Sequence, residues 1–176
     1  TSYYDDHGRE NTKETTSTFT NSKGETKTKY TGVTIGTDTV EVGGTVTLGD
    51  NSKDSFGLRN KKSGSITLVS GGTVVVKGEK NYGALSNGDP YQRQVKKAAN
   101  AYYTGVPEVA KIDINSGATI NVTGKKSTGY AMLSGEGTNA GTIEVTGNNS
   151  PVAPDSATYE GSLGFYGENG KFTNRG

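Results

Sequence analysis

The acidic side chains are the residues of this sequence whose types and spacing could support catalysis. Enzymes that cleave glycans need two carboxylates about 5–9.5 Å apart, or carboxylates beside a basic group, on one surface. When the short repeats of the chain are aligned, Glu144 falls in a column with Val75 and Asn121, and Asp113 falls beside Thr67. Each acid therefore lacks an acidic partner in its column, and no catalytic residue is predicted.

The residue inventory excludes several other chemistries. The chain contains no Cys and a single histidine, His7, so neither a thiolate nucleophile nor a metal or cofactor site is predicted. Its 19 basic and 18 acidic residues give a net charge of +1. This balance argues against nucleic-acid binding, which needs clustered positive charge. An interaction surface is therefore a better hypothesis than an active site.

Pairs of aliphatic residues separated by one residue recur eight times along the chain. The residue between them is polar in seven of the eight pairs, which is the period-2 pattern of a strand with one buried face. The pairs are Val33/Ile35, Val40/Val42, Val46/Leu48, Ile66/Leu68, Val74/Val76, Ile112/Ile114, Ile120/Val122 and Ile143/Val145. They predict short, half-buried strands.

Glycines recur at comparable places beside these strands, which indicates an internal repeat. Residues 66–83 align without a gap on residues 112–129, at an offset of 46, with eight identities. A shorter step also occurs, because Gly44 and Gly64 are 20 residues apart and Gly117 and Gly141 are 24 apart. One coil is therefore predicted to contain about 20–24 residues.

This repeat predicts an all-β fold, a β-solenoid in which each coil pairs its strands with the next coil at a spacing of about 4.8 Å. A narrow core of inward Val and Ile side chains explains why 29% of the residues are hydrophobic while 27 are glycines. We expect one domain over residues 1–176, with about six coils and a cap-like N-terminal region over residues 1–35.

Residues 87–111 interrupt the repeat and carry the signals of a helical insert. Asp89 is a suitable N-cap, and Pro90 suits the first helical position. Gly105 and Pro107 would end the helix. The sequence therefore predicts a helix over residues 89–103.

Two interpretations of this helix remain open. In one, an apolar stripe of Tyr91, Val95, Ala98 and Tyr102 packs on the solenoid wall. In the other, its surface contacts an anionic or polar partner, because solenoid inserts often lie on the binding face. The candidate partner-binding residues of this insert are Tyr91, Gln92, Arg93, Lys96, Lys97 and Tyr103.

Residues 151–161 form a second insert, an extended loop that contains two of the four prolines. The loop is either a spacer or a second contact. In the second case Tyr159 would stack on a sugar while Asp155 and Glu160 bind its hydroxyl groups. Tyr159 is therefore a further candidate binding residue.

Two stretches of the chain carry a resemblance to a known family. The first is GTIEVTGNNS at 141–150, followed after the insert by SLGFYGENGKFTNRG at 162–176, and the second is GATINVTGKKSTGYAMLSGEGTNAG at 117–141. They resemble the passenger repeats of large autotransporters, which are type V secreted proteins, and are most like those of the fusobacterial outer-membrane adhesin family. The likeness is looser over residues 40–88, and the two inserts and the first forty residues depart from it. The chain is expected to end within a repeat at residue 176.

The resemblance implies a right-handed parallel β-helix that is displayed at the bacterial cell surface. Such a passenger would meet the outer membrane only through a C-terminal β-barrel outside this segment. The resemblance also implies adhesion to a host-cell receptor or glycan, or to the surface of a partner bacterium, without catalysis. We expect a monomer that does not bind nucleic acid.

Two alternatives to an adhesin remain open. One is a β-helical carbohydrate-active enzyme, in which a loop would bring Glu108 or Asp89 close to a wall acid. The other is a purely structural stalk or spacer.

Overall fold

The computed structural model of the chain describes residues 12–20, 23–88, 94–98, 101–104, 108–146 and 161–176. Every regular element in these residues is a β-strand, and none of them is a helix. The strands are β1 (Thr12–Thr20), β2 (Thr26–Ile35), β3 (Thr39–Val42), β4 (Thr45–Leu48), β5 (Phe56–Asn60), β6 (Ser65–Leu68), β7 (Thr73–Val76), β8 (Tyr82–Asn87), β9 (Gln94–Ala98), β10 (Ala101–Thr104), β11 (Lys111–Ile114), β12 (Thr119–Val122), β13 (Thr128–Asn139), β14 (Thr142–Val145), β15 (Leu163–Gly167) and β16 (Gly170–Asn174).

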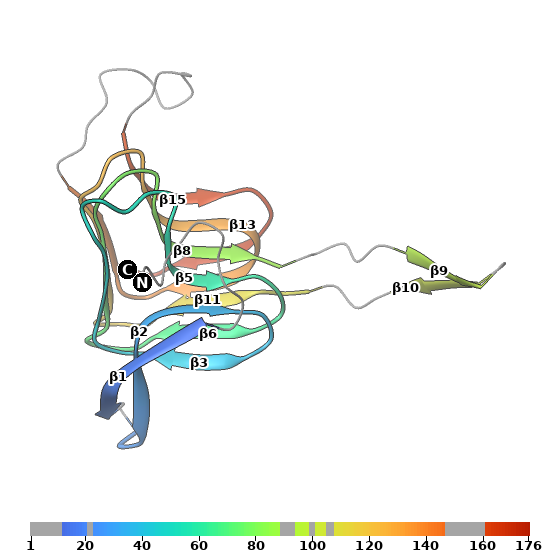
Figure 1. The fold of residues 1–176 in the computed structure, drawn as a ribbon, viewed down its shortest axis with the longest axis horizontal. Helices are drawn as coiled ribbons and strands as arrows, with labels where there is room; N and C mark the ends of the chain where they lie inside the picture. The colour runs from blue at the N-terminus through green and yellow to red at the C-terminus, as the bar shows by residue number, and fades with distance from the viewer. Residues whose placement is uncertain (1–11, 21–22, 89–93, 99–100, 105–107, 147–160) are drawn as a thin grey trace.

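The strands form three walls of a stack of coils (Figure 1), which we call walls A, B and C. Wall A contains β2, β5, β8, the first half of β13 and β15, while wall B contains β3, β6, β11, the second half of β13 and β16. Wall C contains β4, β7, β12 and β14. Strands within a wall are parallel and come from successive coils. This interleaved parallel order is consistent with the predicted β-solenoid.

The register between coils confirms the repeat found in the sequence. Ile66 pairs with Ile112 and Thr73 pairs with Thr119, which is the predicted offset of 46. The coil length was predicted too short, because coils without an insert repeat after 23 residues (β12 to β14) to 28 residues (β4 to β7). Four coils contain all three walls and a fifth contains β15 and β16 in the described residues, against the six expected. Each coil needs more residues because it carries a strand on every one of three walls.

The predicted aliphatic pairs point inward and form the core. Both members are buried in seven of the eight pairs, and the polar residues between them face outward or are partly exposed at most positions. Ile143 and Val145 are only partly buried, because β14 is the last strand of wall C. A buried side chain of this size contributes roughly 1.5–3 kcal/mol, so the stacked columns are the main source of stability.

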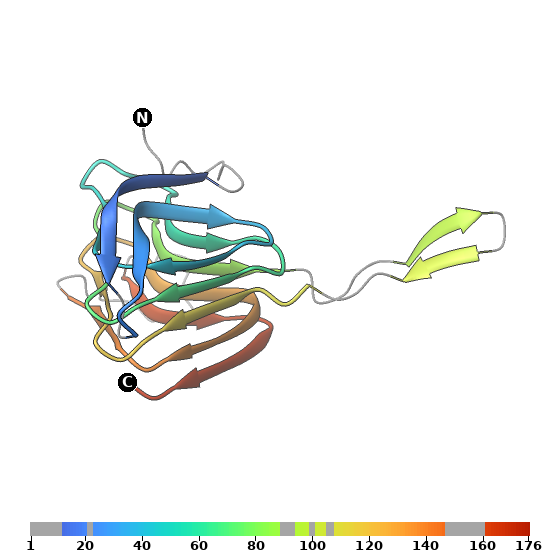
Figure 2. The same ribbon diagram turned by 90° about the horizontal axis from the view of Figure 1, so that it is seen from below.

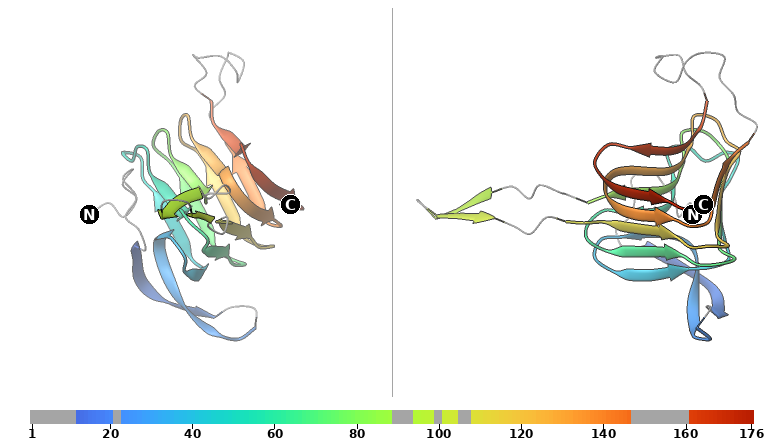
Figure 3. Two further views of the ribbon diagram at one scale, coloured as in Figure 1. Left: turned by 90° about the vertical axis from the view of Figure 1, so that its right-hand side faces the viewer. Right: turned by 180° about the vertical axis from the view of Figure 1, so that it is seen from behind.

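The N-terminal region contributes an antiparallel hairpin to the start of wall A. β1 pairs with β2 along most of its length, and the end of β2 then pairs in parallel with β5 through Val33 and Leu58. Residues 26–31, which alternate Thr and Lys, lie in β2. Figure 3 shows the coils side by side in chain order after this hairpin, from blue to red.

The predicted helix over residues 89–103 is wrong where the structure describes it. Residues 94–98 and 101–104 are instead the strands β9 and β10, which pair in an antiparallel hairpin (Figure 2). Val95, Tyr102 and Thr104 are β-branched or aromatic, and such residues favour extended backbone over helix. The insert is also shorter than 87–111, because Asn87 ends β8 and Lys111 begins β11.

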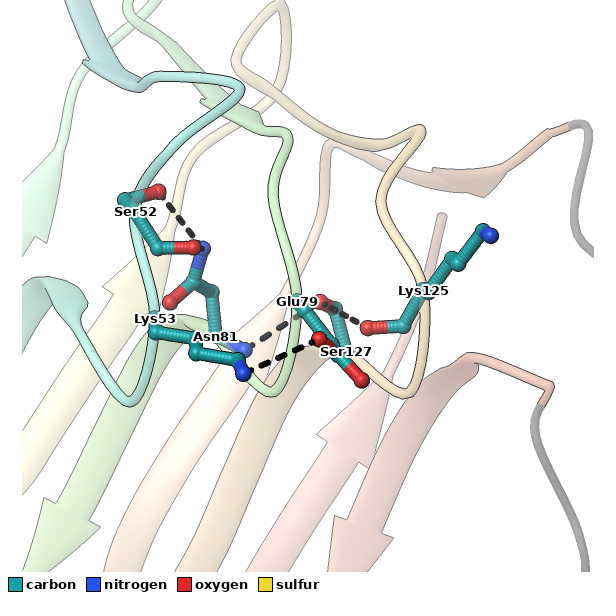
Figure 4. Close-up of polar contacts among 6 residues, drawn as sticks. All are labelled: Ser52, Lys53, Glu79, Asn81, Lys125 and Ser127. Atoms are coloured by element: carbon teal, nitrogen blue, oxygen red, sulfur yellow. Dashed lines mark hydrogen bonds and ion pairs between the residues drawn. The ribbon is translucent and has the colours of Figure 1, made fainter.

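A buried polar ladder closes the corner between walls C and A. The backbone N–H of Ser55 donates to Oδ1 of Asn81 at 2.9 Å, and the N–H of Asn81 donates to Oγ of Ser127 at 3.2 Å. The N–H of Ser127 donates in turn to Oγ of Ser162 at 3.1 Å. Figure 4 shows the centre of this ladder. Each side chain satisfies a backbone donor of the preceding coil that would otherwise be buried without a partner.

The same corner needs backbone of unusual conformation. Asp54, Lys80 and Lys126 have φ values of 50°, 55° and 49°, in the left-handed region that glycine prefers. Beside them, Nζ of Lys53 lies 3.4 Å from a carboxylate oxygen of Glu79 (Figure 4). Non-glycine residues therefore repeat this backbone conformation in successive coils.

We expect Asn81→Ala to destabilise the stack. Its side chain is fully buried and also donates to Oγ of Ser52 and to the carbonyl of Lys77, both at 2.7 Å. The substitution removes these bonds and leaves the N–H of Ser55 without its acceptor, at a cost of about 1–3 kcal/mol for a buried unsatisfied group. Urea unfolding followed by circular dichroism measures the loss. The control is Asn51→Ala at an exposed turn residue, and equal stability of the two variants would contradict the ladder's role.

Candidate functional site

The structure describes the backbone of three of the seven candidate binding residues. Lys96 and Lys97 lie in β9 and Tyr103 lies in β10, where Lys96 pairs with Tyr102 and Tyr103 pairs with Val95. The helix on which these three residues were grouped is therefore replaced by two paired strands. The other candidates, Tyr91, Gln92, Arg93 and Tyr159, lie outside the described residues, as does the loop insert except for Gly161.

The β9–β10 hairpin stands apart from the coils. Its strands pair with each other and with no other strand of the described residues, and they lie beyond the walls in Figures 1 and 2. The apolar stripe was expected to pack on a wall, and the strands of the hairpin do not join one. Figure 1 shows that the excursion leaves after β8 and returns at β11.

The two ends of this excursion meet at the edge of the coil. A Cβ atom on Gly88 would lie 2.7 Å from the carbonyl oxygen of Glu108 and 3.0 Å from the nitrogen of Ala110. Strand pairing continues on both sides, since Ser86 pairs with Met132 before the excursion and Lys111 pairs with Ser65 after it, and the last pair of β8, Asn87 with Ser134, follows a one-residue register irregularity. The hairpin is therefore an addition to a complete coil and is not needed to close it.

A second feature lies directly after this excursion, on the outer face of wall B. It is a pocket of about 240 Å³, which we call the wall B pocket. It is lined by Lys111, Asp113, Glu136, Gly137, Thr138, Lys171 and Thr173. Two carboxylates and two ammonium groups therefore share one surface with two hydroxyl groups.

The strand register explains this grouping. Lys111 pairs with Glu136 and Glu136 pairs with Lys171, so one outward column alternates in charge. Asp113 and Thr138 are paired in the neighbouring column, which continues to Thr173. Paired residues of adjacent strands are about 4.8 Å apart, and the two columns are separated by two residues, or about 6–7 Å.

The charged groups of the pocket differ in how firmly they are held. Asp113 is half-buried, and its Oδ1 accepts a hydrogen bond of 2.9 Å from the backbone N–H of Thr138. Lys111, Glu136 and Lys171 are exposed, and no ion pair joins them to one another in the part of the chain that the structure describes. The pocket thus combines one fixed carboxylate with three charged groups that are free to meet a ligand.

Tyr130 is fully buried inside the coil and lies against Gly137, which lines the pocket. Its hydroxyl donates a 2.7 Å hydrogen bond to the carbonyl oxygen of Ile112. Burial, and to a smaller extent the negative charge of Asp113, raises the pKa of Tyr130 well above its ordinary value, so the hydroxyl remains a donor. Gly137 faces this ring, because a Cβ there would collide with the Tyr130 hydroxyl and with the Ile112 carbonyl.

Sequence analysis missed Glu136 and Lys171 because their strand segments lack the aliphatic pair. Glycine replaces the first aliphatic residue at position 137, and Phe172 occupies the same position one coil later. A signal was present in the repeated Thr-Asn pairs, since Thr138 pairs with Thr173 and Asn139 with Asn174. Aligning on these pairs would have placed Glu136 and Lys171 in one column, although not in that of Lys111, whose strand has no Thr-Asn pair.

The carboxylate columns predicted from the repeats are confirmed. On wall C, Asn121 pairs with Val75 and with Glu144, and on wall B Asp113 pairs with Thr67. Glu144 thus has no acidic neighbour in its column among the described strands. Asp113 is not alone, because Glu41 stands two strands away in its own column, beyond Thr67, and Glu136 lies in the adjacent column of wall B.

Two further hollows lie on the surface of the described residues. One of about 460 Å³ lies between the β1–β2 turn and a coil corner, with Lys23, Glu41 and Asn115 in its lining. The other, of about 280 Å³, is the uncovered end of the core beside Phe165 and Phe172. The first depends on a turn that is only partly described, and the second is the end face of the stack. The wall B pocket is the candidate site, since regular strands position each of its groups.

The described residues were compared with the requirements of a metal site and of a membrane-spanning helix. They contain no group of three or more His, Asp or Glu side chains that could hold a metal ion. Within the same residues, no helix has the length and apolar character needed to cross a bilayer.

Comparisons with known proteins provide no relative. No protein-family model matches the chain, and no curated protein or solved structure matches it significantly. The class of the protein is therefore defined by its fold and its surface features, as an all-β chain of parallel stacked strands with one projecting hairpin and one mixed-charge pocket.

We expect Gly137→Ala to destabilise the chain by about 1–3 kcal/mol, the usual cost of overpacking a close-packed interior. The added methyl group must displace both the Tyr130 ring and the Ile112 carbonyl. Urea unfolding measures the effect, and Gly49→Ala is the matched control because no heavy atom lies within 4 Å of its Cβ position. Tyr130→Phe combined with Gly137→Ala should recover part of the loss, since one of the two collisions is removed. Equal stability of Gly137→Ala and Gly49→Ala would show that contact with the Tyr130 ring does not restrict position 137 to glycine.

Proposed function

We propose that this chain is a right-handed parallel β-helical segment of a surface-displayed, autotransporter-type passenger, and that it acts in adhesion. Its partner would be a host-cell receptor or glycan, or the surface of another bacterium. The coils would serve as a rigid scaffold, and the β9–β10 hairpin would be the contact element. The chain would work by binding, without catalysis or a cofactor, and as a monomer.

The observation that supports this proposal is the insertion of the hairpin into an intact coil. The strands before and after it remain paired with their neighbouring coils, with one register irregularity at the end of β8, and Gly88 lies beside Glu108 where the excursion begins and ends. A segment that contributes nothing to closing the coil is free to serve another purpose. Binding elements are found preferentially on such excursions from a rigid scaffold.

The composition of the hairpin suits contact with a polar or anionic surface. Its strands contain Lys96, Lys97, Tyr102 and Tyr103 within nine residues. Tyrosine offers a large amphipathic contact area at a low entropic cost, and lysine adds attraction to negative charge. The six candidate residues predicted in this insert remain the candidates for this contact, and Tyr159 remains the candidate of the second insert.

Replacing residues 89–107 by a Gly-Ser-Gly link tests the hairpin directly. The link is short enough because the two ends of the excursion already meet. We expect the variant to keep the circular dichroism spectrum and melting temperature of the parent chain, because the coil register does not depend on the hairpin. Beads coated with the variant should lose most of their binding to host cells and to partner bacteria.

Point variants refine the same experiment. Lys96→Ala combined with Lys97→Ala should weaken bead binding, whereas Lys61→Ala combined with Lys62→Ala should not. The control pair lies at the corresponding turn between walls A and B one coil earlier. Full bead binding by a folded deletion variant would reject the hairpin as the contact and would favour the structural spacer.

A carbohydrate-active enzyme is the second candidate, and the wall B pocket is the observation that favours it. Asp113 and Glu136 are two carboxylates in one pocket with two lysines, which is the type of group that glycan cleavage requires. Incubation with a panel of polysaccharides tests this alternative by product release. Release that disappears in both Asp113→Asn and Glu136→Gln would support the enzyme, and its absence across the panel would favour binding alone.

A further inference from the structure

The wall B pocket has the chemistry of a ligand site that the hairpin does not explain. Its lining is entirely polar apart from Gly137, so it does not suit an apolar peptide or a lipid chain. It contains no aromatic side chain, so it does not offer the stacking surface on which neutral sugars and nucleobases are usually held. Recognition there must depend on charge and hydrogen bonding.

The arrangement of charges restricts the ligand further. Lys111 and Lys171 lie on either side of Glu136 in one column, so a bound metal ion would meet two ammonium groups. The carboxylates of Asp113 and Glu136 would repel the closely spaced phosphates of a nucleic acid. A ligand that matches the pocket carries negative groups for the lysines and also hydroxyl donors for the carboxylates.

Saccharides that contain uronic acids meet both requirements. Each unit has one carboxylate and neighbouring hydroxyl groups, and its dimensions are comparable with the grid of about 4.8 Å by 6–7 Å on which the pocket groups stand. Asp113 is already oriented by its hydrogen bond from the Thr138 N–H, so it loses little freedom when it accepts a ligand hydroxyl. Thr138 and Thr173 add hydroxyl groups in the same column.

We propose that the wall B pocket binds an acidic saccharide of the uronic-acid type. Lys111 and Lys171 contact its carboxylates, and Asp113 and Glu136 accept hydrogen bonds from its hydroxyl groups. The inference deepens the proposed adhesive function and rests on it, since it names a glycan class as the partner. The pocket is well placed for this role because Lys111 is the first residue of the strand to which the hairpin returns.

Isothermal titration calorimetry of the whole chain with a trimer of galacturonic acid tests the proposal. We expect measurable binding that weakens with salt, and no binding of the neutral trimer of galactose. Lys111→Ala and Lys171→Ala should each bind about tenfold more weakly, the loss expected for one charge-assisted contact. Asp113→Asn and Glu136→Gln should also weaken binding, because each loses a charged acceptor.

Two matched controls separate the pocket from the general charge of the surface. Lys125→Ala removes an exposed lysine at the corner between walls C and A, and Glu144→Gln removes an exposed acid on wall C. Both should bind like the parent chain. Melting temperatures of all variants should agree within a few degrees, because the altered groups are on the surface or retain their shape.

Several results would overturn the inference. These are equal binding of the galactose trimer, unchanged binding by both lysine variants, an equal loss in Lys125→Ala, or full competition by polyglutamate at matched charge. The outcome is independent of the hairpin experiment. If the chain binds no saccharide but adhesion still depends on the hairpin, only this inference is rejected. If the chain binds the saccharide but adhesion does not depend on the hairpin, only the hairpin contact is rejected.

Discussion

In-register pairing between successive coils is the constraint on which the other features of this chain depend. It places side chains of equivalent positions above one another. The inward side chains of each coil must therefore have nearly the same total volume. Where wall A changes from Ala84 to Tyr130, wall B changes from Ile112 to Gly137. The same register orders the outside, where Lys111, Glu136 and Lys171 stand in one column. A substitution inside one coil is therefore compensated within that coil, and the outer surface can vary without disturbing the core.

The stacked core could be predicted because its signal is local and repeated. Pairs such as Ile66/Leu68 and Ile112/Ile114 each show one buried face, and their offset of 46 became a direct strand pairing. The coil length was less certain, because corners differ in length and glycine marks them only in part. Gly44 precedes β4 on wall C whereas Gly64 precedes β6 on wall B, so the 20-residue step between them joins two different corners and is shorter than a coil.

The hairpin and the pocket were hidden from the sequence for different physical reasons. Tyr91, Val95, Ala98 and Tyr102 have helical spacing, and nothing local shows that Lys96 will pair with Tyr102 in an antiparallel ladder. The pocket depends on contacts between coils. Glycine has a low strand preference, and only the structure shows that the Tyr130 ring fills the space that a side chain at position 137 would need. The pocket therefore depends on packing between coils, whereas the hairpin depends on pairing between two neighbouring strands that the helical spacing concealed.

The direction of the coil-to-coil hydrogen bonds has a mechanical consequence. These bonds run along the stacking axis, so a pull on the two ends of the stack loads the outermost coil first. Coils would then separate one at a time, each at a modest force, instead of failing together. A released coil of 23 to 28 residues lengthens to roughly 75–100 Å at full extension. Under tension the coils would unfold one after another, and each step would absorb mechanical energy while most of the stack stays folded.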